Sequence, residues 1–192
     1  MISNNVHNVF GGNVMSIENK KREVLVSKEQ IEKRVAELGA QLTEEYKEKN
    51  LLVISLLKGS FIFTADLVRK IDLPTRIEFM TTSSYGHGEE SSGRVKVTQD
   101  LKIDDLSDFD VLIVDDITDS AITMSGVIEH LSQRNPASIK CCVLLDKPSR
   151  RQVEYQPDYV GFTIPDMFIV GYGLNYGDYM RNIDHVFAFV DK

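Results

Sequence analysis

The sequence predicts an α/β fold, in which a twisted sheet with a parallel core is flanked by helices and the later strands form a small hood. Short apolar runs typical of buried strands alternate with segments whose apolar residues recur at helical spacing. In the clearest case, the apolar run 111–114 is followed by two carboxylates and then by a helical stripe. The 192 residues are 42% hydrophobic, enough for one domain with a sizeable core, and no internal repeat or linker divides them.

The first part of the chain is expected to contain a long helix, then two strands with a second helix between them. Residues 27–30, Ser-Lys-Glu-Gln, have the form of a capping box at the start of a helix. The stripe that continues this helix consists of Ile31, Val35, Leu38, Leu42 and Tyr46. The elements that follow are a strand over 51–57, a helix from 61 to 68 and a strand over 77–82.

The second part is expected to be richer in strands. Residues 83–93 combine Gly and Ser with two glutamates and lack apolar periodicity, which predicts a long mobile loop next to a strand over 94–98. The helix behind the acidic motif is expected to end near Asn135-Pro136. The later strands are expected over 139–145, 159–162, 168–172 and 186–190.

Composition and charge exclude several classes of partner. The net charge is −7 and no run is rich in Lys or Arg, so no nucleic-acid partner is expected. No apolar run approaches the roughly 20 residues of a membrane helix, so no membrane is expected either.

The two cysteines, Cys141 and Cys142, are adjacent in a strand-like run and point to opposite faces, which rules out an ordinary disulfide between them. Reduced core thiols predict a cytoplasmic protein.

The acidic motif has the features of a site for a phosphorylated ligand. Asp115 and Asp116 stand where the strand ends, and these carboxylates could hold sugar hydroxyls or a hard cation such as magnesium. Backbone N–H groups at the start of the following helix, with the hydroxyls of Ser120 and Thr123, would attract a phosphate.

A simpler interpretation makes the pair solvated turn residues, with Asp119 or Ser120 capping the helix. Asp115, Asp116 and Asp119 nevertheless place three carboxylates close together, and their repulsion favours a bound cation or polyol.

This segment resembles the phosphoribosyl-pyrophosphate motif of the type I phosphoribosyltransferases: an apolar strand, Glu-Asp, two apolar residues, Asp-Thr-Gly, any residue and Thr. Four further blocks follow the order and spacing of the hypoxanthine (hypoxanthine-guanine) phosphoribosyltransferases in that family. They lie at 57–60, 83–86, 144–148 and 160–181, and the resemblance runs from about Glu23 to the C-terminus.

The resemblance implies a fold and a reaction. The fold is that of the type I phosphoribosyltransferases. Residues 1–15 are expected to be a disordered extension and residues 16–192 a single domain, with a hood formed by the N-terminal and C-terminal segments. The reaction joins a 6-oxopurine, hypoxanthine and guanine above all, through N9 to phosphoribosyl pyrophosphate, and it releases pyrophosphate. Magnesium is the implied cofactor. A homodimer or homotetramer is the implied assembly.

Family positions around the ribose and its phosphate carry over to the acidic motif. Asp115 and Asp116 would hold the ribose hydroxyls and magnesium, and Asp119 would be the general acid/base facing purine N7. The 5′-phosphate would be held by Asp119, Ser120, Ala121, Ile122 and Thr123.

The remaining roles carry over to residues spread along the chain. The pyrophosphate would be bound by Lys58, Gly59 and Arg181, behind a lid that contains Ser84 and Tyr85. Family members often have a cis peptide bond just before the lysine. The purine would be bound by Lys147, which selects 6-oxo over 6-amino groups, by the stacking ring of Phe168, and by Ile169 and Asn175. Taken without the resemblance, these residues have simpler interpretations: a turn at Lys58-Gly59, a solvated Arg181, a surface Lys147 and a core Phe168.

Five positions depart from the family pattern. Asp115 replaces the usual Glu, and Thr118 is polar where the family is apolar. Ser120-Ala121 replaces Thr-Gly, and alanine resists a positive φ. Asn175 replaces an Asp that binds magnesium, which predicts a weak metal ligand here. Two alternatives therefore stay open: a nucleotide-sensing regulator that binds phosphoribosyl pyrophosphate without turnover, and a relative that prefers xanthine.

Overall fold

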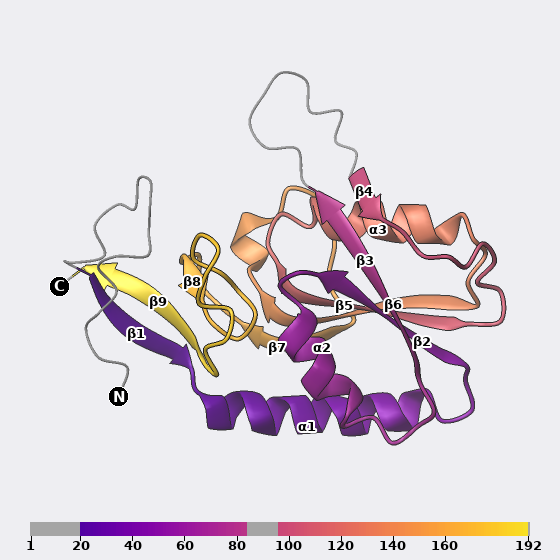
Figure 1. Ribbon diagram of the computed structural model, residues 1–192, viewed down its shortest axis with the longest axis horizontal. Coiled ribbons are helices and arrows are strands. Elements are labelled where there is room, and N and C mark those ends of the chain that lie inside the picture. Colours follow the sequence, from indigo (N-terminus) through magenta and orange to yellow (C-terminus); the bar gives the residue numbers. More distant parts are fainter. Residues whose placement is uncertain (1–19, 84–95, 192) are drawn as a thin grey trace.

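The computed structural model describes residues 20–83 and 96–191, which form two sheets and three α-helices (Figure 1). The larger sheet has six strands in the order β4-β3-β2-β5-β6-β7. All neighbouring pairs in it are parallel except β3 and β4. Its strands are β2 (Leu51–Leu57), β3 (Arg76–Ser83), β4 (Lys96–Gln99), β5 (Asp110–Thr118), β6 (Ser138–Asp146) and β7 (Tyr159–Thr163). This architecture confirms the predicted α/β fold with a parallel core.

Helices cover both faces of the large sheet, since its central strands are apolar on each side. On one face lie α1 (Lys28–Glu45) and α2 (Phe61–Val68), and on the other lies α3 (Ile122–Ser132) (Figure 1). The two adjacent thiols lie on opposite faces of the sheet: Cys142 packs in the core beneath α1, whereas Cys141 packs in the core beneath α3. Both thiols are free and buried, and burial raises the pKa of Cys141 to about 12. The prediction of reduced core thiols is confirmed.

The helix starts and strand positions follow the sequence signals closely. The capping box at α1 is present, because Gln30 N donates to Ser27 Oγ at 3.3 Å and Ser27 N donates to Gln30 Oε1 at 2.8 Å. The predicted strands over 51–57, 77–82, 139–145, 159–162 and 186–190 correspond to β2, β3, β6, β7 and β9, with ends that differ by at most one residue.

A second, antiparallel sheet joins the two ends of the described chain. Its order is β1 (Lys20–Val26), β9 (Val186–Asp191), β8 (Ile169–Val170), and it lies to one side of the large sheet (Figure 1). The strand β1 was not predicted, because most of its side chains are charged and exposed. The predicted strand over 168–172 is wrong in extent. The chain leaves β8 through Gly171, Tyr172 and Gly173, whose φ values are 103°, 47° and 102°.

Residues 1–15 and most of the loop predicted over 83–93 lie outside the described residues, and the assignment of 16–192 to one domain stays a prediction. In the described part of the chain, no helix is both long enough and apolar enough to cross a membrane.

Candidate active site

The predicted site residues gather where the parallel strands end. The turn at Lys58-Gly59 follows β2, the acidic pair lies near the end of β5, and Lys147 follows β6. Because β2, β5 and β6 are neighbours that run in the same direction, their carboxyl ends share one edge of the sheet. Ligands bind at this edge in open α/β sheets.

The two carboxylates of the acidic pair are partly buried and affect one another. Asp116 N donates to Asp115 Oδ1, and Ile117 N donates to Asp116 Oδ1, both at 3.0 Å. Burial, together with the charge of Asp116, raises the pKa of Asp115 well above its ordinary value. Burial also raises the pKa of Asp116, although its hydrogen bonds and the nearby Arg181 act in the opposite direction. A divalent cation would relieve this repulsion, and one or two carboxylates with substrate phosphates are a common magnesium donor set.

A chain of close contacts links the acidic pair to the segment before β9. A Cβ on Gly59 would lie 1.7 Å from Asp116 Oδ2, and a Cβ on Gly173 would lie 2.0 Å from the carbonyl oxygen of Gly59. Arg181 Nη1 donates to the carbonyl oxygen of Gly173 at 2.6 Å. A side chain at Gly173 would meet the backbone of Gly59, and a side chain at Gly59 would displace the Asp116 carboxylate, so the backbone of Gly59 lies directly against that carboxylate. The interpretation of Arg181 as a freely solvated charge is wrong, since it is partly buried in this network.

The turn at Lys58 keeps its side chain exposed, and the peptide bond between Leu57 and Lys58 is cis. Sequence reasoning did not single out Gly173. Its sequence signal was the pattern Gly171-Tyr172-Gly173 inside the last family block.

The loop between β5 and α3 borders a pocket of about 210 Å³. The pocket is lined by Asp115, Ile117, Thr118, Asp119, Ser120, Ala121, Thr123 and Met124. Ala121 directly precedes α3 with φ 66°, and no side chain caps the helix from that position. The capping role suggested for Asp119 is therefore wrong. Ser120 Oγ accepts from the N–H of Ile122 at 3.3 Å, and the buried hydroxyl of Thr118 has no partner among the described residues.

The purine-side residues take unusual environments. Lys147 is only 7% exposed, and its Nζ donates to the carbonyl oxygen of Met167 at 2.6 Å. Phe168 is 61% exposed, and its ring meets Tyr176 edge-on with 5.9 Å between ring centroids. The interpretations of Lys147 as a surface charge and of Phe168 as a core residue are therefore wrong. A buried cation beside an exposed aromatic face suits a planar, carbonyl-bearing base.

Two other predicted purine residues are less directly placed. Ile169 is buried in the core and pairs with Ala188 of β9, so its side chain is not available to a ligand. The side-chain amide of Asn175 donates to the carbonyl oxygen of Gly177. Its weak metal role stays a prediction. The lid residues Ser84 and Tyr85 lie outside the described residues.

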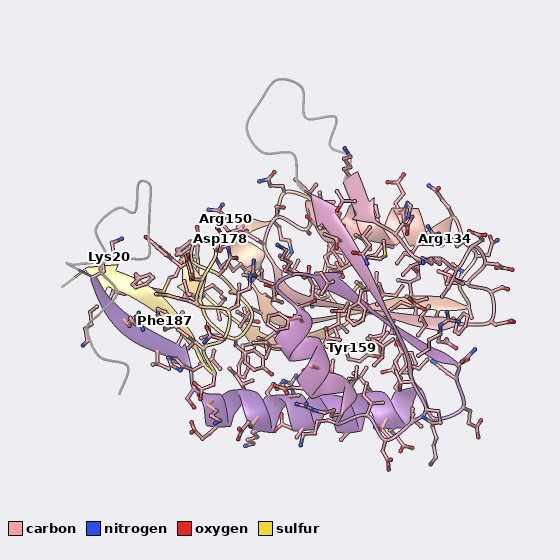
Figure 2. The ribbon with its side chains drawn as sticks, viewed as in Figure 1. Lys20, Arg134, Arg150, Tyr159, Asp178 and Phe187 are labelled. Carbon is pink, nitrogen blue, oxygen red and sulfur yellow. The ribbon has the colours of Figure 1, made fainter. Side chains whose placement is uncertain are left out.

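Sequence reasoning missed two arginines that reach the loop from the segment after β6. Arg150 Nε donates to Asp119 Oδ1 at 3.2 Å, and Arg150 Nη1 donates to Asp166 Oδ2 at 3.3 Å (Arg150 is labelled in Figure 2). Arg151 donates to backbone carbonyls of the same loop and forms an ion pair with Asp146. Their only sequence signal was adjacency to the block that contains Lys147.

Comparison with known proteins agrees with this geometry. Residues 22–177 match the phosphoribosyl transferase domain family. A hypoxanthine phosphoribosyltransferase of Haemophilus influenzae is 51% identical over 85% of this chain and 93% of the relative. A hypoxanthine-guanine phosphoribosyltransferase of Aquifex aeolicus is 45% identical over 91% of this chain and 98% of the relative.

Solved structures agree as well. The crystal structure of a hypoxanthine phosphoribosyltransferase from Staphylococcus aureus superimposes with a TM-score of 0.84 at 40% identity, covering 93% of this chain and 97% of that one. Motif, fold and similarity over nearly the full length lead to one conclusion: this chain belongs to the hypoxanthine (hypoxanthine-guanine) phosphoribosyltransferases of the phosphoribosyl transferase domain family.

Proposed function

We propose that this protein acts in purine salvage. It transfers the 5-phosphoribosyl group of phosphoribosyl pyrophosphate to N9 of hypoxanthine, and also of guanine, giving IMP or GMP and pyrophosphate. One observation carries the proposal: the acidic pair, the pocket at the β5–α3 loop, the Lys58-Gly59 turn and the Lys147–Phe168 surface all lie around one edge of the sheet. A phosphorylated sugar, a second anion and a planar base need such neighbouring subsites.

The leaving group and the sugar bind beside the acidic pair, Asp115 and Asp116. Lys58, the backbone of Gly59 and Arg181 bind the pyrophosphate, and Arg181 adds positive charge near Asp116. As the bond to pyrophosphate breaks, the ribose becomes cation-like, and Asp115 and Asp116 stabilise that charge. Their donor set fits magnesium, which would neutralise phosphate charge when bound. Asn175 would contribute only a weak ligand, as a neutral amide.

The purine base binds at the surface formed by Lys147 and Phe168. Phe168 supplies an exposed ring for stacking. Lys147 donates a hydrogen bond to the 6-oxo group of the purine, and the 6-amino group of adenine could not accept that hydrogen bond. Asp119 exchanges a proton with the purine at N7. Ser84 and Tyr85 belong to the lid that shields the reaction from water.

The experiment is an assay of pyrophosphate release with purified protein, phosphoribosyl pyrophosphate and one base at a time, with and without magnesium. Release with hypoxanthine supports the proposal. No release with any base, together with retained binding of phosphoribosyl pyrophosphate, would identify a sensing regulator. A clear preference for xanthine would identify the other alternative.

We infer that the protein is cytoplasmic and assembles as a homodimer or homotetramer. The free buried thiols suit a reducing compartment. Large apolar side chains are exposed on α2 and β3, at Phe61, Ile77 and Phe79, and suit a surface covered by a second copy. Cell fractionation tests the location. Light scattering during gel filtration tests the assembly, and a monomer at micromolar concentration would contradict it.

A further inference from the structure

The loop between β5 and α3, residues 118–121, is called the phosphate loop here. The segment after β6 donates hydrogen bonds to the carbonyl groups of three consecutive residues of this loop. The carbonyl oxygen of Thr118 accepts from Arg151 Nη1 at 3.0 Å and from Lys147 N at 2.9 Å. The carbonyl oxygen of Asp119 accepts from the same Arg151 nitrogen at 2.7 Å. The carbonyl oxygen of Ser120 accepts from the amides of residues 152 and 153, at 3.0 and 3.3 Å.

These bonds fix the direction of the amides that follow. In a trans peptide the C=O and the next N–H point in opposite directions. With the carbonyls of Thr118, Asp119 and Ser120 held toward the 147–153 segment, the N–H groups of Asp119, Ser120 and Ala121 point away from it. Residues 118–121 also line the pocket, so amides that point away from the 147–153 segment lie on the pocket side of the loop, where they can bind an anion.

Among the residues that the structure describes, Arg151 is the one side chain that donates to two of these carbonyl groups. Its Nε also donates to the carbonyl oxygen of Tyr155 at 3.1 Å, and its Nη2 pairs with Asp146. The side chain is only 16% exposed. A planar guanidinium can serve all of these acceptors at once, whereas a lysine ammonium in the same place cannot.

We propose that Arg151 is a positioning residue for binding of the 5′-phosphate. It touches no substrate atom, and it acts by holding the loop carbonyls so that the opposite amides face the phosphate. This inference rests on the proposed function, because it takes the 5′-phosphate of the substrate and of IMP as the ligand of the loop.

The test compares two ligands that differ only in the phosphate. The affinities of IMP and inosine are measured by calorimetry for the wild type, Arg151→Lys and Arg151→Gln. We expect both variants to bind IMP about 10–100-fold more weakly, because displacement of the loop amides by a fraction of an ångström weakens their hydrogen bonds to the phosphate. Inosine affinity should change less than about twofold. In steady-state kinetics, the KM for phosphoribosyl pyrophosphate should rise more than the KM for hypoxanthine.

A matched control separates positioning from general stabilisation. Arg134 is 15% exposed, pairs with Asp100 and donates to the carbonyl oxygen of Ile103 at 2.9 Å. Figure 2 shows it far from Arg150, the neighbour of Arg151, at the other end of the large sheet. Arg134→Lys should lower the melting temperature as Arg151→Lys does, yet leave the ratio of IMP to inosine affinity unchanged.

The outcomes distinguish the two proposals. A wild type that neither binds IMP nor releases pyrophosphate overturns the proposed function and this inference with it. An active wild type whose Arg151 variants keep their affinity for IMP, or lose IMP and inosine affinity equally, overturns this inference alone. If Arg151→Gln fails to fold, Arg151→Lys, which keeps a cation next to Asp146, decides the question.

Discussion

Asp119 is held by two partners that act on different atoms. Its carboxylate accepts from Arg150, whereas its carbonyl oxygen accepts from Arg151. The side chain can therefore be changed without releasing the backbone of the phosphate loop. This separation allows a proton-transfer role to be tested apart from phosphate binding.

We expect Asp119→Asn to lower kcat by about 10²–10⁴-fold, the usual contribution of a positioned general acid or base. The KM for phosphoribosyl pyrophosphate should change little, because the loop carbonyls keep their bonds. Asp166→Asn is the matched control, since it removes the other carboxylate that Arg150 contacts. Near-normal turnover of Asp119→Asn would eliminate the proposed role.

Lys147 is the second residue whose role can be isolated. Its ammonium is buried and donates to the carbonyl of Met167, one residue before the exposed Phe168. We expect Lys147→Gln, which can donate or accept, to reduce kcat/KM for hypoxanthine by about tenfold or more and to narrow the gap to adenine. Kinetics with both bases check this, and unchanged hypoxanthine kinetics would refute it. Lys58→Gln, a change at the pyrophosphate side, should leave the preference between the two bases as it is.

At the scale of elements, strands with strong apolar patterns could be predicted almost to the residue, and irregular backbone could not. The strand β2 is entirely apolar apart from one serine, and its bounds agree with the sequence signal. The strand β1 has no such pattern and is defined only by its pairing with β9, at the other end of the described chain. Long-range pairing of this kind leaves no local trace in the sequence.

The same contrast holds in the candidate site. Asp115 and Asp116 lie near the end of the buried strand β5 and the phosphate loop follows it directly, so all of them could be located from the strand pattern. Arg151 could not, because its role depends on carbonyl groups more than 30 residues earlier in the chain. Lys147 and Phe168 were found by resemblance, while their burial and exposure became evident only in the fold.

The turn from β5 into α3 contains a backbone conformation that lowers the stability of the folded protein. Ala121 adopts φ 66°, a left-handed conformation that costs an L-residue about 1–2 kcal/mol. Ala121→Gly should therefore raise the free energy of unfolding by about 1 kcal/mol, after allowance for the greater entropy of the unfolded chain. Denaturant unfolding measures it. Ala36→Gly, at an exposed position within α1, should lower the same free energy by about 1 kcal/mol. A loss of stability in Ala121→Gly would contradict the argument.

At the scale of the whole molecule, the acidic pair makes stability depend on pH and on cations. Burial raises both pKa values in the folded protein above those of the unfolded chain. The folded pair therefore holds protons more tightly, and its contribution is most favourable at low pH. That contribution is lost as pH rises from the ordinary carboxyl range through the raised pKa values. Other carboxylates have lowered pKa values in the folded protein and stabilise it more as pH rises. The effect of the acidic pair on stability is therefore isolated by comparing variants.

We expect Asp115→Asn to melt at a higher temperature than the wild type at pH 8, because one of two repelling buried charges is gone. Each 1 kcal/mol gained corresponds to about 2–4 °C in a chain of this size. The difference should shrink at pH 4.5, where the folded pair regains a proton. Magnesium should raise the melting temperature of the wild type at pH 8 by binding the ionised pair, and it should raise that of Asp115→Asn less. Asp104→Asn, which removes an exposed carboxylate, should change neither response. Equal magnesium shifts in wild type and Asp115→Asn would mean that the ion does not bind at Asp115. A melting difference between them that stays constant with pH would mean that the repulsion between the two carboxylates does not limit stability.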